Sequence, residues 1–264
     1  MLSLSPQGVV AALQALPPEL VLVLELLLCF GAILALLRWF GESGMYAYIC
    51  VAVIGANVQV LKPVQFGIYD NPVALGTILF SSTFLATDIL AEHYGAASAR
   101  RGVMLGFSTF LFWTVIMILT MGYSPLTPEQ AGEAMAWAVP IQGAFETLFV
   151  PVPAFFVAGM TAYLISQLHD VWAFETIRKW TQGKALWLRN NVSTIISSLI
   201  DNTVFSVLAW VVLAPQPVGW EPLIFTYILG TFLLRVAIAL LDTPFMYLSR
   251  IVIRRDPPGA ASYA

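Results

Sequence analysis

Residues 71–95 read NPVALGTILFSSTFLATDILAEHYG, an apolar run that ends in two acidic side chains, Asp88 and Glu92. Residues four apart lie on the same side of an α-helix. In a soluble protein such a pair is an ordinary solvated helix face. In lipid, the same spacing places two carboxyl groups one above the other along one side of a transmembrane helix. The remainder of the chain decides which solvent applies.

Composition identifies lipid as that solvent. Of the 264 residues, 59% are apolar and only 10% are charged, and the mean hydropathy is +0.83. Soluble domains are about 45–50% apolar and about 25% charged. Cys29 and Cys50 both fall inside apolar runs without metal-ligand spacing, so we expect neither a disulfide framework nor a metal site.

Seven segments are long and apolar enough to cross a bilayer core of about 30 Å, which takes roughly 20 helical residues. They cover residues 20–39, 45–61, 73–92, 102–122, 140–168, 192–213 and 223–248. Prolines between Val150 and Pro153 predict that the fifth segment is kinked or that its helix begins late. The sequence therefore predicts an all-α integral membrane protein, a bundle of about seven transmembrane helices. We expect one transmembrane domain over residues 1–264, with a short tail over 250–264.

The basic residues divide between alternate connections. The N-terminus and the loops near 62–72, 123–139 and 214–222 carry a single basic residue, Lys62. The other set carries Arg38, Arg100, Arg101, Arg178, Lys179, Lys184, Arg189, Arg250, Arg254 and Arg255. Cytoplasmic loops are enriched in Lys and Arg. We therefore expect an external N-terminus and a cytoplasmic C-terminus.

The sixth segment carries a polar stripe within its apolar run. Asn190, Thr194, Ser197, Ser198 and Asp201 follow one another at helical spacing on one face. Asp201 lies about halfway along the segment, where a charge costs roughly 2.5–3.5 kcal/mol unless it is paired or hydrated. Ser and Thr hydroxyl groups by themselves would also be explained by bonds to their own helix backbone or by hydrogen bonds between packed helices. With a carboxyl group and the following Asn202 added, the stripe favours a water-lined cavity.

The seventh segment supplies an opposite charge near its middle. Arg235 lies at a depth similar to that of Asp201, and Asp242 lies two helical turns further along the same face. One interpretation is a structural ion pair between Arg235 and Asp201 that only holds helices together. The other is a polar site that binds a solute.

Other intramembrane polar residues are weaker candidates. Asp88 and Glu92 either cap their helix end, with Arg100 and Arg101 as neutralising partners, or act in function. Gln167, Asp170 and Asn57 are further polar residues in or at the ends of apolar segments. We take Glu92, Asp170 and Asp242 as coupling or gating candidates, and we consider proton relay by Asp88 or Glu92.

Enzyme motifs are missing from the sequence. It contains no HExxH, no GxGD and no P-loop, and its histidines are His93 and His169. We therefore expect a carrier rather than an enzyme, with no catalytic residues and no cofactor.

Four ordered blocks resemble a known family. They are FLATDILAEHYGAASARR (84–101), SQLHDVWAF (166–174), LWLRNNVSTIISSLIDNTVF (186–205) and ALLDTPFMY (239–247). Together they resemble the bacterial queuosine precursor transporter family, within the vitamin uptake transporter group. The likeness covers residues 46–255, and the helix over 20–39 resembles an addition to a six-helix core.

The resemblance implies import of 7-deazaguanine bases, such as cyano- and aminomethyl-deazaguanine or queuine, across the bacterial inner membrane. It implies that Asp88, Asp170 and Asp201 are the family's acidic positions and that Arg235 stands where many relatives carry Lys. It also exposes a departure, because Ala154 stands where relatives often have Arg. The expected partners are the deazapurine and the lipid bilayer, with no direct contact to nucleic acid. A homodimer is left open.

The chemistry of such a base fits these residue types. One carboxylate accepts two adjacent N–H groups of a guanine-like edge, and a carbonyl needs a donor such as Arg235. Phe84, Trp113, Phe205 and Trp210 are candidate aromatic walls by depth. The expected substrate-binding residues are Asp201, Asp88, Arg235, Ser197, Ser198, Asn202, Asn57 and Gln167.

Two alternatives to a secondary carrier remain at this stage. A substrate-capture subunit of an ATP-driven uptake complex would also lack a nucleotide motif in this chain. An intramembrane enzyme is the other alternative, and it would convert its substrate chemically.

Overall fold

The computed structural model describes residues 5–67, 72–149 and 153–253, without the side chains of residues 153–155. The chain is an all-α integral membrane bundle, as expected. Among the described residues, four helical stretches are long and apolar enough to cross a membrane by length and composition: Pro18–Gln59, Ala96–Met121, Leu186–Val212 and Trp220–Val252. The structure also contains a short two-stranded β-ribbon. It pairs β1 (Pro63–Val64) with β2 (Val73–Ala74) in antiparallel register.

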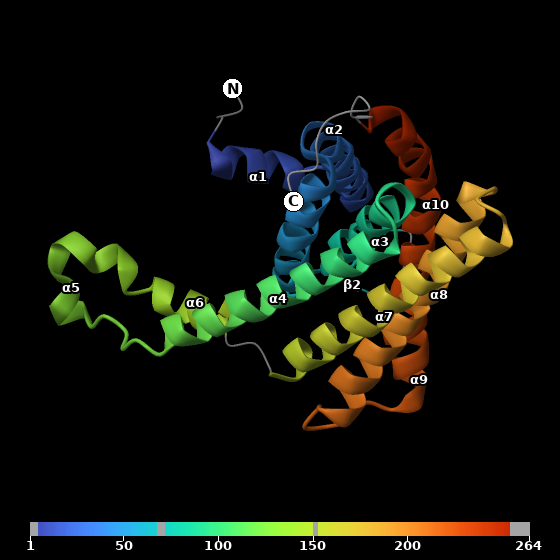
Figure 1. Cartoon of the computed structure of the whole chain (residues 1–264). Coiled ribbons are helices and arrows are strands. Elements are labelled where there is room, and N and C mark those ends of the chain that lie inside the picture. The colour runs from blue at the N-terminus through green and yellow to red at the C-terminus, as the bar shows by residue number, and fades with distance from the viewer. Residues whose placement is uncertain (1–4, 68–71, 150–152, 254–264) are drawn as a thin grey trace.

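The helices follow one another in the order shown in Figure 1. Their bounds are α1 Pro6–Gln14, α2 Pro18–Gln59, α3 Gly76–His93, α4 Ala96–Met121, α5 Pro128–Met135, η1 Ala136–Ala138, α6 Ile141–Phe149, α7 Pro153–Trp180, α8 Leu186–Val207, η2 Leu208–Val212, α9 Trp220–Pro222, η3 Leu223–Ile228 and α10 Leu229–Val252. η1 is a 3₁₀ turn, whereas η2 and η3 are π-helical.

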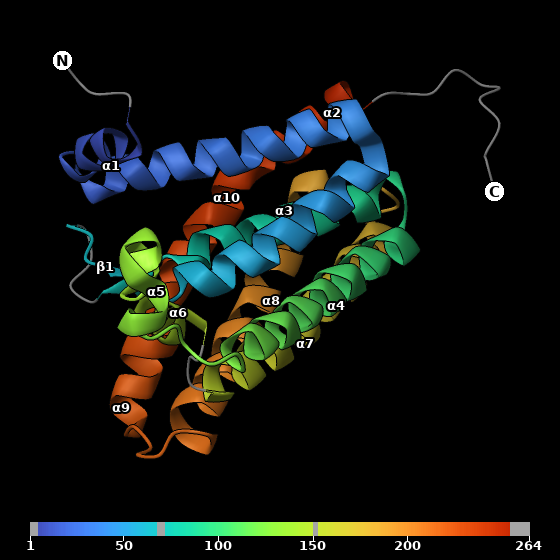
Figure 2. The same cartoon turned by 90° about the vertical axis from the view of Figure 1, so that its left-hand side faces the viewer.

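The first two expected segments, 20–39 and 45–61, are the two halves of α2. Gly41 separates them with φ 56° and ψ −132°, a conformation that glycine adopts without a steric penalty. Figure 2 shows α2 folding back at this point. One long apolar element therefore supplies both expected segments.

The fifth expected segment, 140–168, is not one helix, and the late beginning of its main helix agrees with the expected interruption at the prolines. Residues 141–149 form the separate helix α6, and α7 begins at Pro153 and runs to Trp180. The expected kink falls largely on residues 150–152, which lie outside the described residues. Proline is tolerated in the first turn of a helix but not in its interior, so α7 begins at Pro153. In Figure 1, α5 and α6 project from the bundle.

Helix α5 lies in a stretch that the hydropathy pattern assigned to a loop. Thr127 begins it with a capping box, in which its hydroxyl accepts from the Gln130 N–H at 3.3 Å. The Gln130 side chain in turn accepts from the Thr127 N–H at 3.1 Å. Local capping therefore produced a helix where hydropathy predicted none.

Helix α3 is the centre of the bundle. It contacts α2, α4, α7, α8 and α10, and its residues from Gly76 to Ala91 are mostly buried. Its hydroxyls stay satisfied by bonding carbonyls one turn back, as Ser81 does with the Thr77 carbonyl at 2.8 Å. The stretch that ends in Asp88 and Glu92 is therefore the helix around which the others pack.

Close packing of α4 depends on Gly106. A Cβ at this position would lie 2.5 Å from the Tyr163 hydroxyl and 2.9 Å from the Ile49 side chain. Gly106→Leu is expected to lower the free energy of unfolding by about 1–3 kcal/mol, because overpacking forces helices apart. Unfolding of the purified protein in detergent measures this. Gly31→Leu is the matched control, since nothing lies within 4 Å of a Cβ there. An equal loss of stability in both variants would contradict the prediction.

Candidate functional site

A cavity of about 860 Å³ lies at one end of the bundle. Its walls come from the C-terminal ends of α2 and α4, the start of α7, the end of α8 and the start of α10. Residues of β1, β2 and α6 contribute to the rim. Pockets that bind small molecules measure about 300–1,000 Å³. The cavity is therefore large enough for a base-sized ligand.

A buried ion pair lies in the wall of this cavity. Arg235 Nη2 on α10 is 2.8 Å from Asp201 Oδ2 on α8, and their side chains are 7% and 13% exposed. Ser166 on α7 donates a hydrogen bond to Asp201 Oδ1 at 2.9 Å. Three helices thus position one carboxylate.

This pair retains hydrogen-bonding capacity that the described protein groups do not use. A carboxylate has about four acceptor positions, and Ser166 and Arg235 occupy one on each oxygen of Asp201. Arg235 Nε and Nη1 have no acceptor among the described residues. The site can therefore accept two N–H groups and donate to a carbonyl.

Aromatic rings form much of the remaining wall. Trp113, Phe205 and Trp210 line the cavity, as their depth predicted. Trp210 in η2 and Tyr227 in η3 lie with ring centroids 4.6 Å apart. Trp210 and Tyr227 both lie in π-helical turns, and such turns occur often at functional sites. Flat apolar ligands fit such walls.

Phe84 does not belong to this wall. It is 1% exposed and does not line the cavity formed by the described residues. Phe80, one helical turn nearer to the cavity, lines it instead. Depth was estimated too coarsely to choose between two phenylalanines one turn apart.

Asn57 and Asn202, two of the expected binding residues, also line the cavity. The Asn57 amide donates to the Val53 carbonyl at 2.8 Å. The Asn202 amide donates to the Ile228 carbonyl at 3.1 Å and to the Thr231 hydroxyl at 2.8 Å. In both residues the amide nitrogen is therefore engaged by the protein, while the carbonyl oxygen is the group left to accept from a ligand.

The other expected binding residues lie deeper than the cavity wall. Gln167 is held by Thr83 and Thr87 at 2.8 and 3.1 Å, and Ser197 bonds His169 at 2.9 Å. Asp88 and Ser198 are also buried. The stripe on α8 spans twelve residues from Asn190 to Asp201, about 16 Å of helix, so only its last part reaches the cavity. Substrate contact by Asp88, Ser197, Ser198 and Gln167 stays a prediction.

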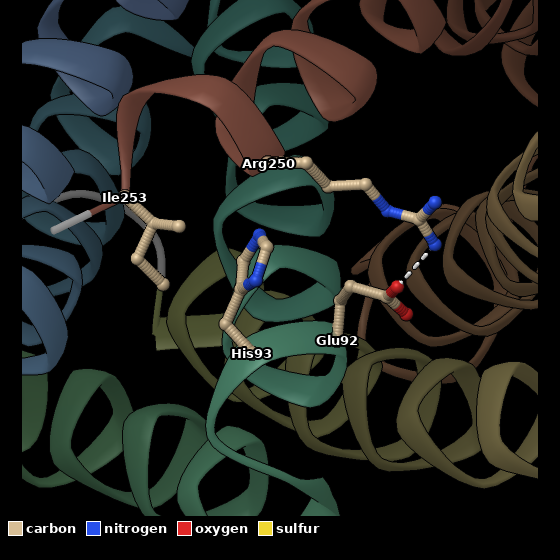
Figure 3. Close-up of a pocket in the computed structure, with 4 residues that line it drawn as sticks. All are labelled: Glu92, His93, Arg250 and Ile253. Atoms are coloured by element: carbon tan, nitrogen blue, oxygen red, sulfur yellow. Dashed lines mark hydrogen bonds and ion pairs between the residues drawn. The ribbon is translucent and has the colours of Figure 1, made fainter. Parts of the chain in front are cut away.

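Glu92 lies at the opposite end of the bundle, where the expected neutralising partners are wrong. Its carboxylate pairs with Arg189 at 2.7 Å and with Arg250 at 2.6 Å, whereas Arg100 and Arg101 are exposed on α4. The first turn of α8 and the last turn of α10 close on this end of α3. Figure 3 shows Glu92 and Arg250 beside His93 in a pocket of about 380 Å³.

Ser166 is the contact that sequence reasoning missed. It stands next to Gln167 in the SQLHD block, but only Gln167 and Asp170 were selected there. Adjacent residues point about 100° apart on a helix, so Ser166 faces Asp201 while Gln167 faces α3. The spacing of Ser166 four residues before Asp170 was the available signal.

Comparisons with known proteins identify the family of the chain. Residues 74–249 match a family described as "Putative vitamin uptake transporter". The chain is 32% identical over 228 residues to a protein of Bacillus subtilis (strain 168) named "Probable queuosine precursor transporter". The match covers 86% of this chain and 92% of that protein. No solved structure matches the chain. The chain therefore belongs to the queuosine precursor transporter family, within the vitamin uptake transporter group.

Proposed function

We propose that this chain is a secondary carrier that imports 7-deazaguanine precursors of queuosine across a bacterial inner membrane. Family membership supports a transporter, and the name of the Bacillus subtilis relative supports the substrate class. The observation that carries the proposal is the Asp201–Arg235 pair, whose unused acceptor and donor positions border an aromatic cavity.

The chemistry of recognition follows from that pair. The two adjacent N–H groups of the guanine-like edge bind the remaining acceptor positions of Asp201. The neighbouring carbonyl of the base accepts from Arg235. Trp113 and Phe205 cover the faces of the ring, because aromatic planes pack well against flat bases. The side chain of Ala154, the departure from the family pattern, lies outside the described residues.

The charge pattern supports an orientation of the chain that suits uptake. The cavity lies at the end where α2 and α4 finish and α10 begins. The positive-inside rule assigns that end to the outside, and it assigns the ends of α3 and α10 to the cytoplasm. With this orientation, the proposed carrier has its binding cavity on the external side, ready to take up substrate.

Reconstitution of the purified chain alone tests this function. In liposomes it is expected to exchange labelled cyano-deazaguanine across the membrane. Unlabelled aminomethyl-deazaguanine or queuine should compete. Adenine should not, because its edge lacks two adjacent N–H donors beside a carbonyl. In cells that cannot synthesise the precursors, queuosine in tRNA is the corresponding readout.

Three results would contradict the proposal. Binding without exchange by the chain alone would favour a capture subunit that needs an ATPase. Recovery of a chemically altered base would favour an enzyme. Equal competition by adenine would contradict recognition of the guanine-like edge by Asp201 and Arg235.

Orientation has its own test. A cysteine at Gln182, in the turn after α7, is expected to react with an impermeant reagent only after the membrane is opened. A cysteine at Glu133 in α5 is expected to react from outside intact cells. Both positions are exposed in the structure. The unchanged chain controls for Cys29 and Cys50. External labelling at Gln182 would reverse the assigned orientation.

A further inference from the structure

A second cluster of ionisable groups lies deeper in the bundle than the Asp201–Arg235 pair. It comprises Asp88 on α3, Asp170 on α7 and Asp242 on α10, each at most 1% exposed. Asp170 interacts electrostatically with both of the other two. Three negative charges buried this close together would repel one another and lose their hydration.

The cationic side chains near this cluster are engaged elsewhere. Arg235 pairs with Asp201, while Arg189 and Arg250 pair with Glu92. Helix α8 faces the carboxyl groups with the neutral side chains of Asn190, Ser193, Thr194 and Ser197. Other titratable groups on the packed helices include His93, bonded to Ser249, His169, bonded to Ser197, Tyr48, bonded to Ser82, Tyr163, bonded to the Val103 carbonyl, and Cys29. The described buried residues of α4 are apolar.

The cluster also has more acceptors than donors. Asp88 Oδ1 and both Asp170 oxygens have no hydrogen-bond donor among the described residues. Ser193, Thr194 and Ser197 lie beside Asp170, but each hydroxyl has one hydrogen. Ser193 and Thr194 donate to the Asn190 carbonyl and to Asp88 Oδ2, each at 3.4 Å, and Ser197 is bonded to His169 Nδ1 at 2.9 Å. A buried acceptor without a donor is costly.

Asn190 provides an independent indication that something binds here. Its side chain is completely buried, and its Nδ2 donates to Asp242 Oδ1 at 2.7 Å. Its Oδ1, in the same amide group, has no donor among the described residues. An acceptor is therefore presented beside a group of carboxyl oxygens, where only a donor or a cation would satisfy it.

A proton fits this site better than a metal ion. The described residues contain no group of three acidic, histidine or cysteine side chains arranged to hold a metal. A bound proton removes one negative charge, and it also turns an acceptor oxygen into an O–H donor. One bound species thus corrects both the excess of charge and the shortage of donors.

We infer that Asp88, Asp170 and Asp242 form a proton-binding site that couples substrate uptake to a proton gradient, with Asp170 at its centre. This rests on the proposed function. Helices α7, α8 and α10 each carry a residue of the ion-pair site and a residue of the carboxyl cluster or its contact Asn190. Ser166, which bonds Asp201, lies one helical turn from Asp170 on α7, and Arg235 lies two turns from Asp242 on α10. On α8, Asn190 and Asp201 belong to one stripe. A helix shift caused by substrate at the ion pair therefore moves the carboxyl groups as well.

Accumulation in liposomes that hold the purified chain tests the inference. With the external solution one pH unit more acidic, the wild type should accumulate labelled cyano-deazaguanine about tenfold for each proton coupled. A protonophore should abolish this accumulation. Asp170→Asn should show no accumulation under the same gradient. Its exchange of labelled for unlabelled substrate at equal pH, which needs no net proton movement, should remain within about twofold of wild type.

Matched variants make the outcome decisive. Glu175→Gln removes an acid five residues further along α7 that pairs only with Arg178 and Lys179 in the described residues, and it should accumulate as the wild type does. Asp242→Asn should repeat the Asp170→Asn result, and it replaces that variant if the latter is not recovered folded. Accumulation by either Asn variant at the wild-type level would overturn the site. So would accumulation driven by a sodium gradient and indifferent to pH. Absence of wild-type exchange would instead reject the proposed function itself.

Discussion

Asp201→Asn is expected to raise the dissociation constant of the substrate about ten- to 150-fold. A hydrogen bond to a charged group contributes about 1.5–3 kcal/mol. The new amide also presents a donor where the substrate presents an N–H. Equilibrium binding of labelled cyano-deazaguanine to the purified protein measures the change. Glu221→Gln, an exposed acid on α9 near the same end of the bundle, is the matched control and should bind normally.

A double-mutant cycle separates the two roles of Asp201. If it only neutralises Arg235 at 2.8 Å, combining Asp201→Asn with Arg235→Gln should restore much of what either change loses, because neither charge is left unpaired. If both residues contact the substrate, the double variant should bind no better than the weaker single variant. Near-normal binding by Asp201→Asn, at normal levels of folded protein, would show that Asp201 does not bind the substrate and that the polar stripe serves helix packing.

Glu92→Gln is expected to lower the free energy of unfolding by about 3–5 kcal/mol. Removing one partner of a buried pair leaves an uncompensated charge, and Arg189, 1% exposed, depends on Glu92 for its carboxylate contact. Arg250 loses its contact at the same time. The clamp joins the ends of α3, α8 and α10, so its loss should also loosen this end of the bundle. Unfolding in detergent and the yield of folded protein measure the effect.

Glu175→Gln is again the appropriate comparison. Its pairs with Arg178 and Lys179 are 3.8 and 3.9 Å long and partly exposed, so the loss should be below about 1 kcal/mol. Equal stability of the two variants would show that the clamp does not hold the helices. A stable Glu92→Gln protein that exchanges substrate but no longer responds to a pH gradient would assign Glu92 to proton coupling, the alternative considered from the sequence.

Much of the architecture was available without coordinates. Composition and the length of apolar runs identified an all-α membrane bundle, and four sequence blocks identified the family. The partner of Asp201 was also within reach. Two opposite charges in the middle of apolar segments avoid lipid by pairing, so their depth alone indicated Arg235. Helix period placed Asn190 through Asp201 on one face, because that spacing is a property of the chain itself.

Contacts that depend on how helices rotate and meet required the tertiary structure. The stripe on α8 meets two different environments, since its end reaches the cavity with Asp201 while its start meets the buried carboxyl groups at Asn190. The partners of Glu92 are Arg189 and Arg250 rather than Arg100 and Arg101, which are nearer in sequence. Periodicity determines which residues share a face and how deep they lie. The packing of one helix against another decides which face meets which, and that information lies in no single segment.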